Sequence, residues 1–176
     1  MVMKKSINIW GFVALTVIWA WLLGFATPVN AETLKYKGYT YVVKVERALI
    51  GDVEGHSMVF TVRRIIVVFE NGDTATAFSV STNDGIKGSG QFLNYMTFTF
   101  GDGSTIITKT QGTTGGTAVG VYQSAGLTGE IIKGTGRFEG IKGTATATYK
   151  FFPLEKGEDG PKGIGEGILT FTLPSK

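Results

Sequence analysis

Apolar and polar side chains alternate with a period of two along most of this 176-residue chain, from about residue 34 to residue 173. No segment after residue 31 places apolar residues at i, i+3, i+4 and i+7 through three turns, as an amphipathic helix requires. Glycine supplies 26 of the 176 residues, well above the usual share of about 7%. It recurs between runs rich in Thr, Val, Ile, Phe and Tyr. The pattern predicts an all-β protein of strands joined by turns.

Eight segments have the composition and alternation of strands, or nine if the sixth is broken near Gly126. Tight turns are predicted at 71–73 (Asn-Gly-Asp) and at 101–104 (Gly-Asp-Gly-Ser), because these residue types adopt the backbone conformations that hairpins need. Such short connections make neighbouring strands antiparallel. The predicted strands cover about residues 34–47, 56–70, 73–81, 91–100, 104–111, 117–134, 142–152 and 165–173.

The segment from His56 to Glu70 is apolar on both faces and contains the doublets Arg63-Arg64, Ile65-Ile66 and Val67-Val68. One face can fill the interior. Because no helix is available to cover the other, we expect subunits to associate through it as a dimer or trimer. Closure into an eight-stranded antiparallel barrel removes exposed strand edges. The alternative is a β-sandwich in which this segment is a central strand with a bulge near Arg63-Arg64.

The first 31 residues have the organisation of a secretory signal. Lys4-Lys5 precede an apolar stretch over about 9–26, which is followed by Pro28 and by Val29-Asn30-Ala31. We expect cleavage after Ala31, which leaves a secreted or periplasmic β-domain of residues 32–176 that is not in the membrane. The alternative is an uncleaved anchor, because the apolar stretch is close to the length that spans a bilayer. Loss of the two lysines lowers the net charge from +3 to +1.

Charge and residue counts exclude several functional classes. The Lys and Arg residues are scattered along the strands and do not cluster on one face, so we expect no nucleic-acid partner. The chain has no cysteine, which excludes disulfides and thiol nucleophiles. His56 is the single histidine, so we expect no metal site and no serine triad, and we interpret His56 as a surface residue at a strand start. No cofactor is expected.

Residues 134–145 (Gly-Thr-Gly-Arg-Phe-Glu-Gly-Ile-Lys-Gly-Thr-Ala) resemble the G-T-G-x-F-x-G-x-x-G signature of the allene oxide cyclase-like and dirigent-like barrel superfamily. The glycines let the chain leave one strand, turn around a buried Phe138 and re-enter as the next strand. The resemblance implies an eight-stranded antiparallel barrel of the allene oxide cyclase-like type, often trimeric, with a hydrophobic central cavity. Members include cofactor-free cyclases, proteins that guide radical coupling, and exported bacterial proteins without an assigned activity.

The resemblance carries no catalytic residue over to this chain. Plant cyclases of the superfamily place a carboxylate and an amide two residues apart on the first strand, shortly before a Glu-Arg pair, and use a cysteine deeper in the cavity. If Glu46-Arg47 corresponds to that pair, Val43 and Val45 occupy the two functional positions, and no cysteine exists. The catalytic residues therefore stay unknown.

Polar side chains that interrupt the apolar alternation are candidate cavity residues, because a charge facing the interior is costly unless it is paired or functional. The alternative places the arginines at barrel rims or subunit interfaces, paired with Glu46 or Glu70. A bulge near Arg63-Arg64 would exchange the arginine that points inward. From the faces they share with apolar neighbours, the candidates for the cavity are Tyr41, Arg47, Arg64 and Asn94.

These observations favour an exported barrel that binds a small hydrophobic molecule in its cavity. Two alternatives stay open. One is a cofactor-free cyclase or isomerase of the allene oxide cyclase-like or dirigent-like type, in which Arg64 or a tyrosine polarises an oxygen. The other is a structural, envelope-associated oligomer with a filled core.

Overall fold

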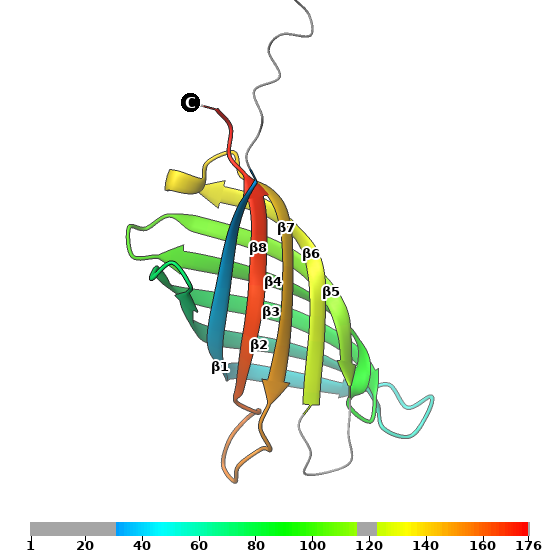
Figure 1. Ribbon diagram of the computed structural model, residues 1–176. Coiled ribbons are helices and arrows are strands. Elements are labelled where there is room, and N and C mark those ends of the chain that lie inside the picture. Colours follow the sequence, from blue (N-terminus) through cyan, green and yellow to red (C-terminus); the bar gives the residue numbers. More distant parts are fainter. Residues whose placement is uncertain (1–30, 116–122, 176) are drawn as a thin grey trace, which may run out of the picture. The chain divides into compact units, whose positions relative to one another are not determined.

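The computed structural model describes residues 31–115 and 123–175, which form a closed barrel of eight antiparallel strands (Figure 1). Each strand pairs with its neighbours in sequence, and β1 closes the barrel against β8. The predicted antiparallel barrel is confirmed, and the sandwich is not formed. The predicted signal segment lies outside the described residues except for Ala31. The strands are β1 (Glu32–Leu49), β2 (His56–Phe69), β3 (Thr74–Ile86), β4 (Ser89–Phe100), β5 (Thr105–Gly115), β6 (Gln123–Thr135), β7 (Lys142–Phe151) and β8 (Gly163–Thr172).

The strand boundaries differ most from the prediction in the hairpin of β3 and β4. Both strands extend to a two-residue turn at Lys87 and Gly88, whose φ angles are 51° and 84°. The residues on either side of this turn are polar and include glycines, a composition typical of a loop. The pairing of β3 with β2 and of β4 with β5 nevertheless satisfies their backbone hydrogen-bonding groups. The sixth strand continues unbroken through Gly126, and the first part of its predicted range lies outside the described residues.

The up-and-down order of the strands places alternate connections at opposite ends of the barrel (Figure 1). We call the end with the β1–β2, β3–β4 and β7–β8 connections the mouth end. The opposite end, with the β2–β3, β4–β5 and β6–β7 connections, is the closed end. The predicted turns at 71–73 and 101–104 both lie at the closed end, where Gly72 and Gly103 have φ angles of 89° and 82°.

A cluster of aromatic rings fills the closed end. Phe69 stacks on Phe100 with ring centroids 5.2 Å apart, and Phe100 lies 4.8 Å from Phe138. The guanidinium of Arg137 covers the rings of Phe100 and Phe138 at 4.8 and 4.9 Å and pairs with Asp73 at 2.7 Å. Stacked and edge-on aromatic contacts of this kind each contribute about 0.5–1.5 kcal/mol beyond their burial. The interior at this end therefore holds side chains and no ligand space.

The glycine-rich corner that carries the sequence signature lies beside this cluster. A short 3-10 helix, η1 (Gly136–Phe138), joins β6 to β7, and Phe138 is buried as predicted. A Cβ on Gly134 would lie 2.1 Å from the carbonyl oxygen of Phe138, and Gly136 has a φ of 62°. Glycine is thus required at both positions for the chain to turn around the ring.

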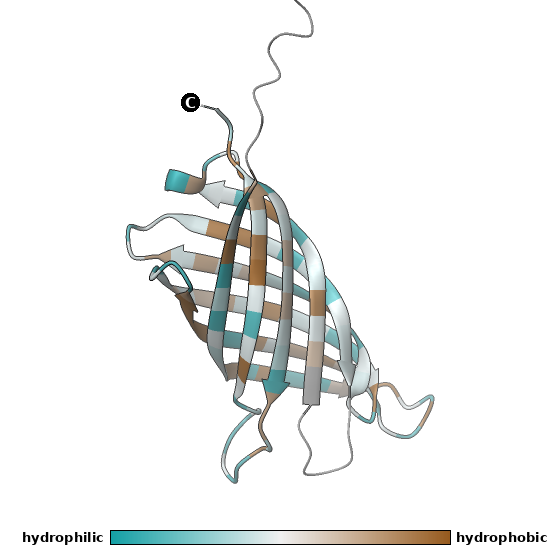
Figure 2. Cartoon of the chain, viewed as in Figure 1, coloured by the Kyte–Doolittle hydropathy of each residue, from teal (hydrophilic) through white to brown (hydrophobic). Residues whose placement is uncertain are grey.

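Buried and exposed residues alternate along the strands except at bulges, and Figure 2 shows hydrophobic and hydrophilic residues interleaved along them. Strand β1 contains one β-bulge, where the pairing with β2 shifts between Val42 and Lys44. Thr40 and Val42 face the interior before the bulge, and Val45 and Arg47 line it afterwards. The inward parity of β1 therefore changes half-way along the strand.

The outer surface of β8, β1, β2 and β3 carries many exposed apolar side chains, and we call this surface the outer apolar face. Its most exposed members are Tyr39 and Ile66, at 60% and 58%, which are direct cross-strand neighbours. The prediction that β2 is apolar on both faces is confirmed. No helix within the described residues is long and apolar enough to cross a membrane. The other members are Tyr41, Val43, Met58, Val68, Phe78, Ile164 and Ile168.

Candidate functional site

A cavity of about 990 Å³ occupies the mouth end of the barrel. Strands β1 to β7 supply its walls, and the β1–β2, β3–β4 and β7–β8 connections form its rim. Its apolar walls include Ile65, Met96 and Leu127, and polar side chains lie between them. The aromatic cluster forms the end of the interior opposite the mouth. The barrel therefore has one filled half and one open half.

Two of the four predicted cavity residues line this space. Asn94 is 3% exposed on β4, accepts a hydrogen bond from Ser79 Oγ at 2.5 Å and donates one to Thr110 Oγ1 at 3.3 Å. Arg47 lies at the rim, where it lines the cavity and remains exposed to solvent. Asn94 is thus held in a hydrogen-bonded row that crosses β3, β4 and β5, while Arg47 is free to move in solvent.

The other two predicted residues, Tyr41 and Arg64, lie on the outer surface, so their predicted placement is wrong. Tyr41 is 47% exposed, and the guanidinium of Arg64 lies 5.0 Å above the ring of Phe78 on the neighbouring strand. The bulge in β1 separates Tyr41 from the inward parity of Arg47. Strand β2 pairs with β3 without a shift, so Arg64 stays outside with Ile66.

Arg63 takes the interior position that was predicted for Arg64. Its Nη1 donates a hydrogen bond to the carbonyl oxygen of Pro161 at 2.9 Å, and its guanidinium lies 4.6 Å above the ring of Phe151. Burial lowers the pKa of Arg63 to about 10, because no carboxylate offsets the loss of solvation. Within the described residues Arg63 forms no ion pair. Arg63 lies on the same face of the strand as the apolar Ile65 and Val67, which was the signal in the sequence for an inward position. The doublets at 63–68 make the other face equally apolar, so the sequence did not distinguish Arg63 from Arg64.

Two buried hydroxyl groups near Arg63 lack hydrogen-bond partners of acceptable geometry in the described part of the chain. They are Thr40 Oγ1 on β1 and Tyr149 Oη on β7, whose side chains are 4% and 5% exposed. Burial raises the pKa of Tyr149, and the charge of Arg63 and the neighbouring hydroxyl of Tyr36 partly oppose that rise. Both residues line the cavity. An unsatisfied buried polar group costs about 1–3 kcal/mol, so a ligand oxygen that reaches these hydroxyls gains that energy.

Three inward-facing glycines of β8 make room for the rings of this wall. A Cβ on Gly163 would lie 2.7 Å from Phe151, one on Gly165 would lie 2.3 Å from Tyr149, and one on Gly167 would lie 2.3 Å from Tyr36. Real Cβ atoms do not approach so closely, so only glycine fits at these positions. The Gly-x-Gly-x-Gly pattern of β8 therefore lets the rings from β7 and β1 lie across the strand.

His56 connects two elements of the cavity rim. Its Nδ1 lies 2.5 Å from Asp52 Oδ1 on the β1–β2 connection, and its Nε2 lies 2.7 Å from Asp84 Oδ1 on β3. These hydrogen bonds raise the pKa of His56, and the bond from His56 lowers the pKa of Asp52. Both ring nitrogens are thus occupied by carboxylates. The described residues contain no group of His, Cys, Asp or Glu that could hold a metal ion.

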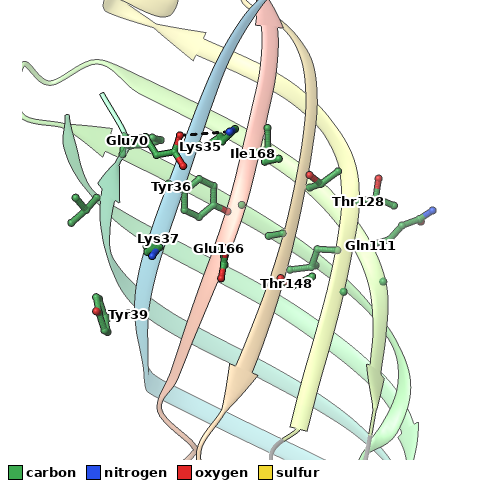
Figure 3. Close-up of a pocket in the computed structure, with 18 of the residues that line it drawn as sticks. Lys35, Tyr36, Lys37, Tyr39, Glu70, Gln111, Thr128, Thr148, Glu166 and Ile168 are labelled. Atoms are coloured by element: carbon green, nitrogen blue, oxygen red, sulfur yellow. Dashed lines mark ion pairs between the residues drawn. The ribbon is translucent and has the colours of Figure 1, made fainter. Parts of the chain in front are cut away.

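A second hollow, of about 860 Å³, is lined by side chains of β1, β2 and β5 to β8 (Figure 3). The ion pair between Lys35 Nζ and Glu70 Oε2, at 3.7 Å, crosses one part of it. Its threonines, Thr128 and Thr148 among them, come from outward-facing positions of β5, β6 and β7. Neither of the unpaired buried hydroxyls lies here, so the mouth-end cavity is the better candidate site.

No model of a known protein family and no curated protein matches this chain. Similar solved structures include two pterocarpan synthase dirigent proteins, GePTS1 and PsPTS1, each with a TM-score of 0.48. GePTS1 is 14% identical over 99% of this chain and 100% of its own, and PsPTS1 is 18% identical over 83% and 97%. The likeness of these two structures to this chain is in the barrel fold. At these identities the similarity concerns the fold.

The chemistry available in the barrel follows from the residues at its mouth end. Arg63 is a partly buried cation, and Tyr149 and Thr40 carry buried hydroxyls that make no hydrogen bond of acceptable geometry within the described residues. The opposite wall offers the row of Ser79, Asn94 and Thr110, whose hydrogen bonds are already made to one another. The side of the cavity formed by β1, β2 and β7 is therefore the side prepared for a polar group.

Proposed function

We propose that this dirigent-like barrel is an exported protein that binds one small, largely apolar molecule in the mouth-end cavity. The cavity volume of about 990 Å³ carries the proposal, because sites for small ligands measure about 300–1,000 Å³. The filled closed end supports it too, because it gives the ligand a floor and leaves one entrance. The export signal predicted at residues 1–31 supports a secreted or periplasmic location.

Occupancy can be tested with 1-N-phenylnaphthylamine, an uncharged apolar dye whose fluorescence rises in apolar surroundings. We expect saturable binding of one dye per chain and loss of that binding in Ala125→Trp, because Ala125 lines the cavity. The matched control is Glu130→Trp, which places the same side chain on the outer surface of the same strand. Equal binding by both variants would place the dye outside the cavity and contradict the proposal.

The natural ligand can be sought directly. Organic extraction of the protein purified from its own host, followed by mass spectrometry, is expected to yield a lipophilic compound in near-stoichiometric amount. An empty extract from a protein that also fails to bind the dye would favour the structural, envelope-associated oligomer.

A cofactor-free cyclase or isomerase is the second candidate, and the pair of Tyr149 and Arg63 favours it. Both groups can donate hydrogen bonds to an oxygen that becomes negative in a transition state, inside a partly desolvated cavity. A compound that emerges chemically altered, with the change lost in a folded Tyr149→Phe variant, supports catalysis. Recovery of the supplied compound unaltered supports binding alone.

We also propose that copies of this chain cover the outer apolar face and form a dimer or trimer. Tyr39 and Ile66 lie next to each other near its middle and are more than half exposed. Large exposed apolar surfaces commonly mark protein–protein contacts. Native mass spectrometry of the purified domain gives the oligomeric state directly, and a monomer at micromolar concentration would contradict the proposal.

A further inference from the structure

We infer that the cavity ligand is an amphiphile whose single anionic group, a carboxylate or sulfonate, binds Arg63 while its apolar body lies against the apolar side chains of the cavity wall. The inference rests on the proposed function and specifies the chemical class of its ligand.

The charges that line the cavity are unbalanced. Its charged residues are Arg47, Arg63, Lys87 and Asp159. Lys87 has a carboxylate partner, Glu54, whose Oε2 lies 3.8 Å from the Lys87 ammonium. Within residues 31–115 and 123–175, Arg63 has no ion-pair partner. A cation held out of water without a counter-ion is costly for a protein. The anionic group of a ligand would provide the counter-ion that Arg63 lacks.

The guanidinium of Arg63 has donors to spare. It carries five N–H groups, and its described hydrogen bond joins Nη1 to the carbonyl oxygen of Pro161. The ring of Phe151 covers one of its flat faces. The planar arrangement of the other N–H groups matches the two oxygens of a carboxylate, and such charge-assisted bonds are about twice as strong as neutral ones.

The two unpaired hydroxyls lie on the strands that flank Arg63. Thr40 is on β1, which pairs with β2, and Tyr149 is close enough to Arg63 for the two to influence each other electrostatically. Between them β8 presents only glycines, Gly163 and Gly165, to the interior. The rings of Phe151 and Tyr149 lie across these two glycines, so Arg63 and the hydroxyls of Thr40 and Tyr149 all belong to the same side of the cavity.

The rest of the cavity suits an apolar body. Ile65, Met96 and Leu127 contribute apolar wall around this group of polar residues, and the aromatic cluster lies beyond them. A molecule that is charged at one end and apolar along its length would match both parts. A ligand with several charges would leave some of them against apolar wall.

Two dyes that share an N-phenylnaphthylamine body test the inference. 1-Anilinonaphthalene-8-sulfonate carries a sulfonate, and 1-N-phenylnaphthylamine lacks it. We expect the wild-type barrel to bind the sulfonate dye about 10-fold or more tightly than the neutral dye, because a hydrogen bond to a charged group is worth about 1.5–3 kcal/mol. In Arg63→Met this preference is expected to disappear while affinity for the neutral dye changes less than threefold.

The neighbouring arginine provides the matched control. Arg64→Met removes the same charge from the adjacent position, but on the outer surface over Phe78, and is expected to keep the preference for the sulfonate dye. Circular dichroism checks the fold of each variant. If Arg63→Met does not fold, Arg63→Gln takes its place, because its amide can still donate to Pro161 without the charge.

The outcomes separate the two levels of the proposal. Wild-type protein that binds both dyes equally, or a loss of preference in Arg64→Met as large as in Arg63→Met, overturns the anionic ligand and leaves the apolar binding cavity standing. Wild-type protein that binds neither dye in the cavity overturns the proposed function itself. Sulfonate-dye binding that survives Ala125→Trp lies on the outer surface and also overturns the anionic ligand.

Discussion

At the scale of single residues, Arg63 and Arg64 show how one position along a strand decides the role of a side chain. Both are arginines on β2, and each lies over an aromatic ring of another strand. Arg64 remains solvated, while burial lowers the pKa of Arg63 to about 10. A shift of that size corresponds to a cost of roughly 3 kcal/mol for keeping Arg63 charged in the folded protein.

This cost predicts that Arg63 is not needed for stability. Because its folded pKa is depressed, the cost applies at every pH below about 10 and is relieved only as the pH rises from there toward the ordinary pKa of arginine. Replacement of a buried charge by an apolar side chain is often neutral or stabilising by about 1–4 kcal/mol. We expect Arg63→Met to keep or raise the free energy of unfolding at pH 7, measured by urea denaturation.

The same measurement on Arg64→Met provides the reference, with an expected change within about 0.5 kcal/mol because the site is on the surface. A loss of more than about 2 kcal/mol in Arg63→Met would show that the hydrogen bond to Pro161 and the contact with Phe151 outweigh the desolvation cost. Arg63 would then act mainly as an anchor for the β7–β8 connection.

His56 makes the rim of the cavity sensitive to pH. Its raised pKa stabilises the fold fully below about pH 6.5, and this contribution is lost as the pH rises through the raised value. The lowered pKa of Asp52 acts in the opposite direction: its contribution is present above about pH 3.8 and lost as the pH falls through the lowered value. The contacts of His56 with Asp52 and Asp84 are therefore strongest between these limits.

We expect amide hydrogen exchange in residues 50–55 to become faster, relative to the intrinsic rate, when the pH is raised from about 5.5 to about 8.5. In His56→Gln the protection of this segment should be low at both pH values, because glutamine stays neutral. The ion pair of Lys87 with Glu54 also holds this rim. Equal protection at both pH values in the wild type would contradict this prediction.

At the scale of elements, β8 is a strand whose inward face has no side chains along most of its length, because glycines occupy those positions. Aromatic rings from β7 and β1 pack directly against the backbone at Gly163, Gly165 and Gly167. The strand keeps its regular pairing with both neighbours. Glycine is usually unfavourable within a strand, so its use at three alternate positions indicates that the position of the rings outweighs that cost.

We expect Gly165→Ala to lower the free energy of unfolding by about 1–3 kcal/mol, because its methyl group overlaps the Tyr149 ring at 2.3 Å and forces it to move. The shift would also displace the unpaired hydroxyl and weaken binding of the anionic dye. Gly126→Ala on β6 is the control, because a Cβ there meets no atom within 4 Å. Gly126→Ala should leave stability unchanged or slightly higher.

At the scale of the whole molecule, the interior and the exterior surfaces of the barrel have different roles. The interior is divided into an aromatic closed end and an open cavity, while the exterior carries the outer apolar face. The chain therefore buries enough apolar surface to fold and still exposes Tyr39 and Ile66 to solvent. An exposed apolar surface of this kind favours association and would otherwise favour aggregation.

The association predicts a charge-sensitive interface. Ile66→Asp should convert the oligomer to monomer at micromolar concentration in native mass spectrometry or sedimentation, because a carboxylate at the centre of an apolar contact loses its solvation. Ile132→Asp is the control: Ile132 is 45% exposed, but it lies on β6, away from the outer apolar face. An oligomer that survives Ile66→Asp would place the interface elsewhere.

Much of the fold was predictable because it depends on local patterns. The period of two, the Asn-Gly-Asp and Gly-Asp-Gly-Ser turns and the corner around Phe138 each act within a few residues, and all of them are observed. The inward face of β4, with Asn94 among apolar residues, was predictable for the same reason. On β4 one of the two sets of alternate residues was clearly apolar along the whole strand.

The site was less predictable because the inward face of β1 and β2 depends on pairing. Tyr41 and Arg47 share a parity in the sequence, but the bulge after Val42 turns one outward and leaves the other at the rim. On β2 the doublets make both faces of the strand apolar. Only the pairing with β1 and β3 decides that Arg63 faces the interior and Arg64 the outer surface. The sequence by itself determined the all-β class, the turns at 71–73 and 101–104 and the antiparallel pairing of eight or nine strands, because these follow from local backbone preferences. The tertiary structure alone decided which arginine is buried, because barrel closure selects a single register for strands whose two faces are alike.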